Sequence, residues 1–193
     1  MIRSFLAIRL PEPIRKDLES IQERLKETDA PVKWVTPDNV HLTLKFLGNI
    51  ESKDVEKIHD IVSKIVTKET HLILRGEGVG AFPHIKSPRV IWVGISGEID
   101  RLKDIHIRME EELETIGFRP EERSFSPHLT IGRVKTGVHK ALLDRLIALK
   151  DYRSQPFKAG EIILFKSDLR PYGPIHTPLK TIPLGGEMRS KKS

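Results

Sequence analysis

Hydrophobic residues along the chain recur with two periods, which predict helices interspersed with strands. Apolar spacings of 3 and 4 residues predict helices that begin near Pro11 and Ser52 and that span about 98–116 and 138–150. Alternating or short continuous apolar runs predict strands at 2–9, 33–36, 40–47, 71–75, 89–95, 128–134, 157–166 and 175–182. This order predicts an α+β fold with largely antiparallel sheets.

The same pattern predicts which helix faces are buried and where elements end. The predicted inward residues are Ile14, Leu18, Ile21 and Leu25 in the first helix, Val55, Ile58, Val62, Ile65 and Val66 in the second, and Ile99, Leu102, Ile105, Met109, Leu113 and Ile116 in the third. We expect Ser52 to cap the second helix and Gly117 to end the third. We expect Gly48 and Asn49 to close the strand 40–47. The run 76–80 is expected to be a turn, because it lacks a G-x-G-x-x-G pattern and no helix follows it.

The chain contains an internal repeat. His-Leu-Thr-Leu at 41–44 and His-Leu-Thr-Ile at 128–131 are each followed by a predicted helix, a strand, a turn with glycine or proline, and a second strand. That second strand begins at Val90 in one copy and at Ile175 in the other, 49 and 47 residues after the histidine. We therefore predict a single domain, residues 1–184, of two pseudo-symmetric lobes, followed by a disordered basic tail at 185–193.

The repeated motif places a histidine and a threonine on one face of each strand. Because side chains alternate along a strand, His41 and Thr43 share one face, and the neighbouring leucines anchor the other. The same holds for His128 and Thr130. If the two lobes face each other, two imidazoles and two hydroxyl groups converge on one cleft. One imidazole can then take a proton from water and the other can protonate a departing sugar oxygen, while the hydroxyl groups hold a phosphate.

A single His-x-Thr strand is usually a surface pair, so this interpretation rests on two copies in corresponding places. The other histidines in the first three quarters of the chain are expected to be ordinary surface or helix residues: His59, His71, His84, His106 and His139. Neither motif is accompanied by His-Glu-x-x-His, His-x-His or an acidic cluster. We therefore predict chemistry that uses no metal and no other cofactor.

The composition excludes some kinds of site and indicates the partners and the location of the protein. The absence of cysteine excludes disulfides, thiolate catalysis and cysteine zinc sites. The net charge of +6 favours polyanionic partners such as RNA or nucleotides, although many basic proteins bind no nucleic acid. Four amide residues beside abundant Lys, Arg and Glu are typical of a thermophile. The N-terminal apolar run is too short for a signal peptide or a membrane span, so we expect a cytoplasmic monomer with no membrane partner.

Several stretches of the sequence are similar to one known family. The pair VHLTLKFLGNI (40–50) and SFSPHLTIGRV (124–134) resembles the 2H phosphoesterases. The resemblance is specific to the RNA 2′,3′-cyclic phosphodiesterases of bacteria and archaea, also called 2′-5′ RNA ligases, in RSFLAIRLPEPIR (3–15), GAFPHIKSPRVIWVGI (80–95) and SDLRPYGPIHTPL (167–179). It covers the chain up to about residue 183.

This resemblance implies a bilobal α+β fold with antiparallel sheets lining a central cleft and helices outside. It implies metal-independent hydrolysis of RNA 2′,3′-cyclic phosphate ends to 2′-phosphomonoesters. In that reaction His41 is the acid that protonates the 3′ oxygen, His128 is the base that activates water, and Thr43 and Thr130 hold the phosphate. Some members of the family also join tRNA halves through a 2′-5′ linkage. The residue pattern alone allows the acid and base labels to be exchanged.

Three further residues are candidates for substrate binding. Phe46 and Arg133 follow the two motifs and suit base stacking and phosphate contact, but alternation puts both on the leucine side, so only a bulge or a strand end would bring them to the site. His176 stands where the family pattern usually has a tyrosine. Two other functions stay open. One is a non-catalytic RNA- or nucleotide-binding module. The other is a 2H enzyme acting on a different cyclic phosphate, such as ADP-ribose 1″,2″-cyclic phosphate, or on 2′-5′ oligoadenylate.

Overall fold

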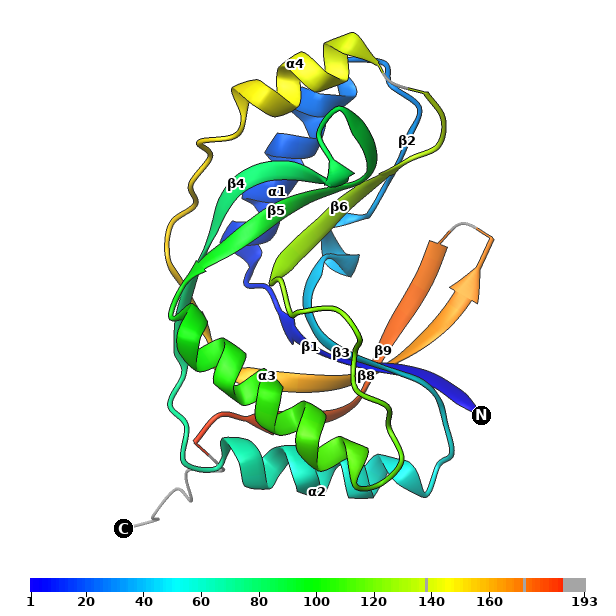
Figure 1. Ribbon diagram of the computed structural model, residues 1–193, viewed down its shortest axis with the longest axis vertical. Coiled ribbons are helices and arrows are strands. Elements are labelled where there is room, and N and C mark those ends of the chain that lie inside the picture. Colours follow the sequence, from blue (N-terminus) through cyan, green and yellow to red (C-terminus); the bar gives the residue numbers. More distant parts are fainter. Residues whose placement is uncertain (138, 172, 186–193) are drawn as a thin grey trace.

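Helices and strands follow one another nearly as the hydrophobic pattern predicts (Figure 1). The structure, a computed structural model, describes residues 1–137, 139–171 and 173–185. The helices are α1 (Glu12–Lys26), α2 (Asp54–Val66), α3 (Ile99–Glu114) and α4 (Lys140–Ala148), with a 3-10 turn at Pro37–Asn39. The strands are β1 (Ile2–Arg9), β2 (Val32–Trp34), β3 (His41–Ile50), β4 (Leu72–His84), β5 (Ser87–Gly97), β6 (His128–Val134), β7 (Phe157–Ala159), β8 (Glu161–Arg170) and β9 (Gly173–Pro183).

The strands form two antiparallel sheets, which confirms the predicted α+β class. The first sheet has the order β3-β1-β8-β9, and the second has the order β2-β6-β5-β4-β7. Each sheet takes strands from both halves of the chain. The β4-β5 hairpin follows β3 in sequence but pairs with β6, and the β8-β9 hairpin follows β6 but pairs with β1. Each His-Leu-Thr strand therefore lies in the sheet that holds the hairpin of the other half.

The helices cover the two sheets as separate pairs. Helices α1 and α4 contact one another and pack against β6 and β4 of the second sheet, in the upper half of Figure 1. Helices α2 and α3 contact one another and lie against β9 and β3 of the first sheet, in the lower half. Strands β3 and β6, which carry the two motifs, also contact each other where the sheets meet. The motif strands thus occupy the junction between the two sheets.

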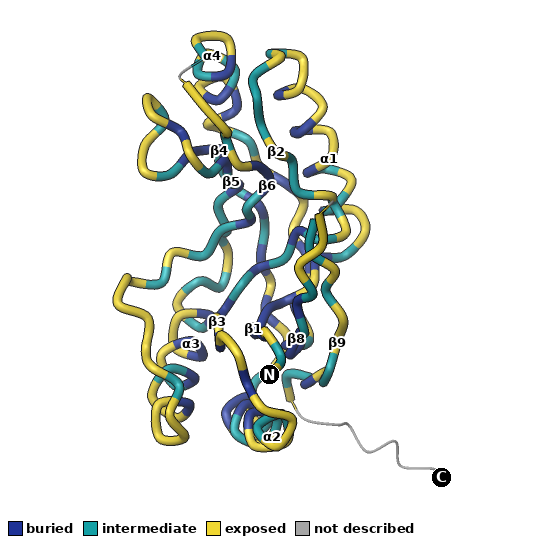
Figure 2. The backbone as a smooth tube through the Cα atoms, turned by 90° about the vertical axis from the view of Figure 1, so that its right-hand side faces the viewer, coloured by how far each residue is buried: buried dark blue, intermediate teal, exposed yellow. Residues whose placement is uncertain are grey.

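The predicted inward faces of the helices form the core. Leu18, Ile58 and Leu102 are at most 1% exposed, and Figure 2 shows such buried positions alternating with exposed ones along the helices. Ile116 is the exception, because it follows the end of α3 and is 37% exposed. Helix spacing thus predicted the core contributed by the helices except at a helix end.

The expectation of a turn at residues 76–80 was wrong, because this run lies inside β4 and pairs with β5. The ring of Trp92 lies against Gly80, where a Cβ atom would be 2.4 Å from a ring carbon. Gly78 has a φ angle of 72° at a shift in the register between the strands. The glycines therefore allow close packing and a bulge within a continuous strand.

Two other boundaries differ from the prediction near α2. Gly48 and Asn49 do not close their strand, since β3 continues to Ile50 in pairing with β1. Ser52 does not cap α2, which begins at Asp54 without a side-chain cap. Glycine and serine occur both within elements and at their ends. These residues alone therefore did not determine where β3 ends or where α2 begins.

The predicted strand 157–166 is two strands in different sheets. Strand β7 pairs with β4 in the second sheet, and β8 pairs with β1 in the first. Gly160, between them, is where the chain crosses from one sheet to the other. Residues 186–193 of the predicted basic tail lie outside the described residues.

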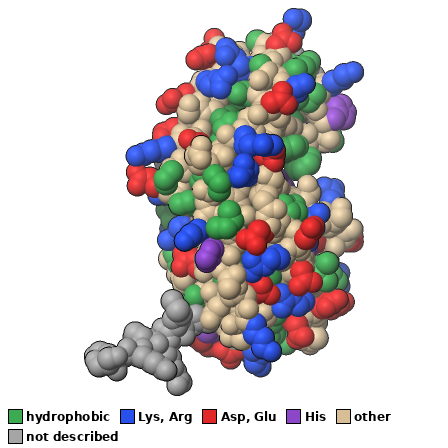
Figure 3. All heavy atoms as spheres, turned by 90° about the vertical axis from the view of Figure 1, so that its left-hand side faces the viewer, with side chains coloured by type: hydrophobic (Ala, Val, Ile, Leu, Met, Phe, Trp, Pro, Cys, Tyr) green, Lys and Arg blue, Asp and Glu red, His purple; other side chains and the backbone are tan. Residues whose placement is uncertain are grey.

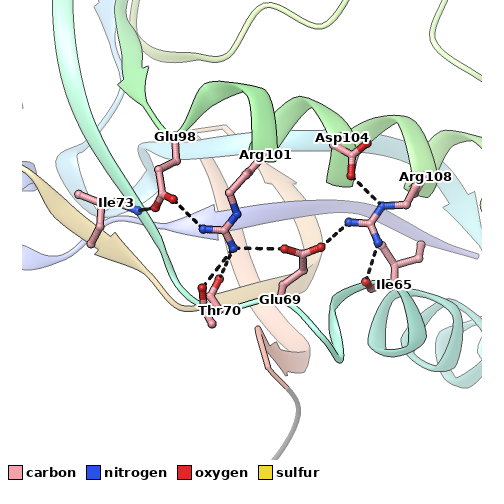
Figure 4. A network of polar contacts seen from close by, with 8 residues as sticks. All are labelled: Ile65, Glu69, Thr70, Ile73, Glu98, Arg101, Asp104 and Arg108. Atoms are coloured by element: carbon pink, nitrogen blue, oxygen red, sulfur yellow. Dashed lines mark hydrogen bonds and ion pairs between the residues drawn. The ribbon is translucent and has the colours of Figure 1, made fainter.

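An ion-pair network fastens the segment after α2 to α3 (Figure 4). The Glu69 carboxylate accepts hydrogen bonds from Arg108 at 2.5 Å and from Arg101 at 3.2 Å, and Arg101 also donates to Glu98 at 2.7 Å. Burial by itself raises the pKa of Glu69, but the hydrogen bonds from the two arginines outweigh it and lower the pKa overall. The network therefore holds the start of β4 against α3 while this carboxylate is ionised.

The surface carries charges of both signs. Figure 3 shows acidic and basic side chains interspersed over the face it draws, so the net charge of +6 forms no single patch on that face. Among the described residues, no helix has both the length and the apolar character needed to cross a membrane.

Candidate active site

His41 is held at the start of β3 by a backbone carbonyl group. Its Nδ1 atom lies 2.8 Å from the carbonyl oxygen of Asn39. Because a carbonyl oxygen can only accept a hydrogen bond, Nδ1 carries the proton and Nε2 keeps the free lone pair. The side chain of Asn39 in turn donates to the carbonyl oxygen of Pro174 at 3.0 Å, which ties this turn to β9. The tautomer and orientation of His41 are thus fixed by its own backbone.

His128 is held in the same way at the start of β6. Its Nδ1 atom lies 2.7 Å from the carbonyl oxygen of Ser126, again two residues earlier in the chain. The edge of the ring meets Phe82, with ring centroids 5.0 Å apart. Both histidines therefore leave Nε2 available for proton transfer, which matches the repeat seen in the sequence.

The surroundings of His41 are aromatic and partly buried. Its ring stacks on Phe5 at 4.6 Å between centroids, and His176 meets it edge-on at 5.2 Å. Burial, and then the charge of His176, lower the pKa of His41 to about 4, although the hydrogen bond to Asn39 partly opposes this shift. Burial also lowers the pKa of His176. Without a bound anion, His41 is therefore a neutral imidazole at neutral pH.

Thr43 and Thr130 occupy equivalent positions beside the histidines. Thr43 pairs with Ala7 across the first sheet, and Thr130 pairs with Trp92 across the second. Both threonines are half-buried, while the next side chain along each motif is fully buried. Each strand is therefore anchored from behind by apolar residues, and each shows histidine and threonine on its other face.

A bulge after each threonine brings Phe46 and Arg133 to the histidine faces. In the first sheet Ala7 pairs with Thr43 and Phe5 pairs with Phe46, so one extra residue lies between Thr43 and Phe46. Cross-strand partners share a face, and Phe46 is 60% exposed on the face that carries Thr43.

The second sheet repeats this bulge. Trp92 pairs with Thr130 and Val90 pairs with Arg133, so the alternation is reset between Thr130 and Arg133 as well. Arg133 is exposed on the face that carries Thr130. Simple alternation would put Phe46 and Arg133 on the leucine side, and the bulge that the sequence analysis named as a condition brings both to the histidine side.

One pocket lies beside each histidine. The pocket beside His41 has a volume of about 270 Å³ and also contains His176, Phe165 and two arginines, Arg9 and Arg15. The pocket beside His128 has a volume of about 350 Å³ and is walled by aromatic rings. Its lining is contributed by β4, β5, α3 and the segment before β6. The two pockets share none of their lining residues.

Lys45 is a buried ammonium that sequence reasoning did not single out. Its side chain is 0% exposed, and Nζ donates to Glu110 at 2.5 Å and to the carbonyl oxygen of Arg119 at 2.9 Å. Glu110 also accepts from the backbone N–H of Glu121. A lysine in a strand, two residues after Thr43, is expected to face solvent. Lys45 is buried instead because α3, which is distant in sequence, packs over it.

His106, which was expected to be an ordinary surface or helix residue, is a helix residue of α3, and its side chain is buried at 7% exposure. Its ring stacks on Phe125 at 4.0 Å between centroids. Burial lowers its pKa, and the neighbouring Glu110 opposes this shift. The stacked pair holds the segment that leads to Ser126 and His128. Over the described ranges, no group of three or more His, Cys, Asp or Glu side chains gathers in a metal-binding arrangement.

The sequence and fold resemble those of known phosphoesterases. The family model described as LigT like phosphoesterase matches twice, over residues 8–92 and 93–176. The chain is 35% identical over 184 residues to the RNA 2′,3′-cyclic phosphodiesterase of Methanothermobacter thermautotrophicus, covering 95% of this chain and 99% of that protein. It is 37% identical over 180 residues to the protein of the same name from Methanocaldococcus jannaschii, covering 93% and 99%.

A solved structure has the same arrangement of helices and strands. The crystal structure of a protein from Thermus thermophilus superposes with a TM-score of 0.79 at 24% identity, covering 96% of this chain and all of that one. This likeness confirms the fold. The thermophilic bias of the composition also agrees with the organisms in which these relatives occur.

Proposed function

Because the chain belongs to the LigT-like phosphoesterase family, we propose that it hydrolyses 2′,3′-cyclic phosphates at RNA ends to 2′-phosphomonoesters, using His41 and His128. The relatives named RNA 2′,3′-cyclic phosphodiesterase support hydrolysis of a cyclic phosphate. The observation that carries the two-histidine mechanism is the matched pair of imidazoles, each with Nδ1 donating to a carbonyl group and Nε2 left free.

In this mechanism the phosphate lies between the two Nε2 atoms. Nε2 of His128 removes a proton from water, which attacks phosphorus, while protonated Nε2 of His41 gives its proton to the departing 3′ oxygen. The hydroxyl groups of Thr43 and Thr130 donate to the non-bridging oxygens, where negative charge grows in the transition state. Arg133, which is exposed on the His128 face, adds a cationic contact to the same phosphate.

The low pKa of His41 is compatible with its role as an acid once substrate is bound. The cyclic phosphate carries a negative charge, which favours the protonated imidazole beside it. Burial and His176 act in the opposite direction, and they make the protonated ring a strong proton donor. His41 therefore takes up its proton with the anionic substrate and gives it up readily to the 3′ oxygen.

We extend the proposal from hydrolysis to the joining of two RNA strands. The same two imidazoles, with their roles unchanged, serve a 5′-hydroxyl group in place of water, and the product is then a 2′-5′ linkage between two RNA strands. Microscopic reversibility allows the pair to break this linkage as well. RNA ends such as tRNA halves are the substrates that this chemistry suits.

The test is hydrolysis of an oligonucleotide that ends in a 2′,3′-cyclic phosphate, with a chelator present. His41→Ala and His128→Ala are each expected to lower kcat by about 10²–10⁴-fold, because each removes one proton-transfer group. His84→Ala is the matched control, since His84 is exposed at the end of β4 and lines neither pocket. The product is expected to be the 2′-phosphate.

Three outcomes would contradict this proposal. One is full activity in either alanine variant, and another is a strict requirement for added metal. The third is salt-dependent RNA binding without turnover, which would favour a non-catalytic binding module. Faster turnover of ADP-ribose 1″,2″-cyclic phosphate or of 2′-5′ oligoadenylate would keep the mechanism and change the substrate.

A further inference from the structure

The two pockets beside the histidines differ in their side chains. The pocket beside His41 contains Arg15, which pairs with Asp38 at 2.5 Å, and Arg9, which suits a phosphate of an RNA strand. Among the described residues, the pocket beside His128 has no arginine in its lining; Glu77 and Lys103 are its charged residues, and Phe82, Trp92 and Phe125 border it. Aromatic rings that border a pocket suit a stacked nucleobase, because every base has a π face.

Trp92 is the centre of the aromatic wall. Its ring lies over Gly80, and its centroid is 5.3 Å from that of Phe82, which in turn meets the edge of His128. The indole Nε1 atom is buried and has no hydrogen-bond partner among the described residues. Because this N–H is buried, Trp92 offers an occupant of the pocket the surface of its ring and no hydrogen-bond donor.

A cyclic phosphate does not need this second pocket. Both of its ester oxygens belong to one ribose, and the departing 3′ oxygen places that ribose on the side of the acid. The nucleophile enters from the opposite side, beside the base. In hydrolysis the nucleophile is water, which fills about 30 Å³. The pocket beside His128 has a volume of about 350 Å³, which is room for a nucleoside.

We propose that the pocket beside His128 binds the nucleoside at the 5′-hydroxyl end of a second RNA strand, which replaces water as the nucleophile. This inference rests on the proposed function and on its assignment of His128 as the base. The 5′ oxygen attacks phosphorus and gives its proton to Nε2 of His128. The bond from phosphorus to the 3′ oxygen breaks, and that oxygen takes the proton of His41. A 2′-5′ phosphodiester results, and no further reactant is needed.

Lys103 extends this site towards the next nucleotide of the second strand. It is an exposed residue of α3 at the border of the pocket. A base stacked on Trp92 would place the phosphate that follows it near this border, where an ammonium group can pair with it. A 5′-hydroxyl dinucleotide should therefore be a better nucleophile than a nucleoside alone.

The experiment measures how a cyclic-phosphate oligonucleotide divides between ligated and hydrolysed product. The added nucleophile is a 5′-hydroxyl diadenosine dinucleotide, and initial rates are followed as its concentration rises. With the wild-type protein, the ratio of ligated to hydrolysed product is expected to rise and then saturate. Trp92→Leu is expected to lower this ratio about tenfold, the effect of losing one base-stacking ring. Trp34→Leu is the matched control, since Trp34 lies in the same sheet and lines neither pocket.

A second variant keeps the test decisive if Trp92→Leu does not fold. Lys103→Gln changes an exposed residue, and it is expected to lower the ratio with the dinucleotide but not with adenosine. Lys64→Gln on α2 is its control. Wild-type hydrolysis without saturable ligation would overturn the inference and leave the proposed function intact. An unchanged ratio in both pocket variants would also overturn it. Absence of hydrolysis in the wild-type protein would overturn both proposals.

Discussion

At the scale of single residues, the site depends on how one histidine is kept free of its proton. His41 is stacked on Phe5 and faces His176, and its pKa is lowered first by burial and then by the charge of that second histidine. A tyrosine, which the family pattern usually has in place of His176, would bring no positive charge at low pH. His176 therefore makes the protonation of His41 in this chain sensitive to a neighbour that itself titrates.

Replacing His176 by glutamine is expected to raise the pKa of His41 above about 4, because the repelling positive charge is removed. The titration of His41, followed by NMR in the free protein, should shift to higher pH, and the pH profile of kcat/KM should change with it. His84→Gln, which changes an exposed histidine outside the site, should leave both unchanged. A His41 midpoint that stays in place or moves to lower pH in His176→Gln would contradict this account.

Residue-scale features of the site were predictable only where they depend on local alternation. His41, Thr43, His128 and Thr130 lie on the expected faces because each is within two residues of its motif partner. The face on which Phe46 lies depends on a bulge in the pairing with β1, and the face on which Arg133 lies depends on a bulge in the pairing with β5. A bulge is a property of two strands, so it could not be derived from the sequence of one.

At the scale of elements, Lys45 connects the first motif strand to the segment that precedes the second. It belongs to β3, its ion-pair partner Glu110 belongs to α3, and its other acceptor is the carbonyl group of Arg119. Glu110 also receives the N–H of Glu121. One buried ion pair therefore fastens β3, α3 and the path of the chain towards His128.

Lys45→Met is expected to destabilise the protein by about 3–5 kcal/mol, because it leaves the carboxylate of Glu110 buried without its cation. The double variant Lys45→Met, Glu110→Met should recover most of this loss, since no unpaired charge remains. Urea denaturation measures the free energy of unfolding of the single and the double variant. Lys16→Met, which breaks the exposed pair with Glu12, is the control and should leave the midpoint unchanged. A double variant as unstable as the single one would show that the charge is not the cause.

Element types were predictable, and the departures occur where tertiary packing decides the outcome. Helical spacing identified α1, α2 and α3 because each buries one continuous face. The glycine-rich run in β4 has the composition of a turn, but it is a strand because Trp92 of β5 packs against Gly80. The separation of β7 from β8 likewise depends on which sheet edge each strand meets.

At the scale of the whole molecule, the repeat predicted matching halves but not the exchange of hairpins between them. Each motif strand pairs within a sheet completed by the other half of the chain, and one apolar core includes residues of both sheets and of all the helices. We therefore expect unfolding to be a single cooperative transition. The pH dependence of that transition follows from the groups whose pKa values differ between the folded and unfolded states.

Three histidines, of which His106 is buried and His41 and His176 are half-buried, dominate this dependence above pH 4. The pKa values of His41, His106 and His176 are all lowered, in each case mainly by burial. From the ordinary value of 6.5 down to about 4, the unfolded chain therefore binds more protons than the folded protein. The free energy of unfolding should fall as pH falls through this range. The lowered pKa of Glu69 adds a further loss below its ordinary value of 4.5, because its arginine partners hold only the ionised form.

The contribution of His41 can be isolated with His41→Phe, which keeps a ring to stack on Phe5 and removes the titrating group. The free energy of unfolding, measured in urea from above pH 6.5 to about pH 4, should fall less steeply in this variant than in the wild-type protein. His84→Phe changes an exposed histidine and should give a curve parallel to the wild type. If His41→Phe also ran parallel to the wild type, His41 would have the same proton affinity in both states, and its low pKa could not set the protonation state of the site.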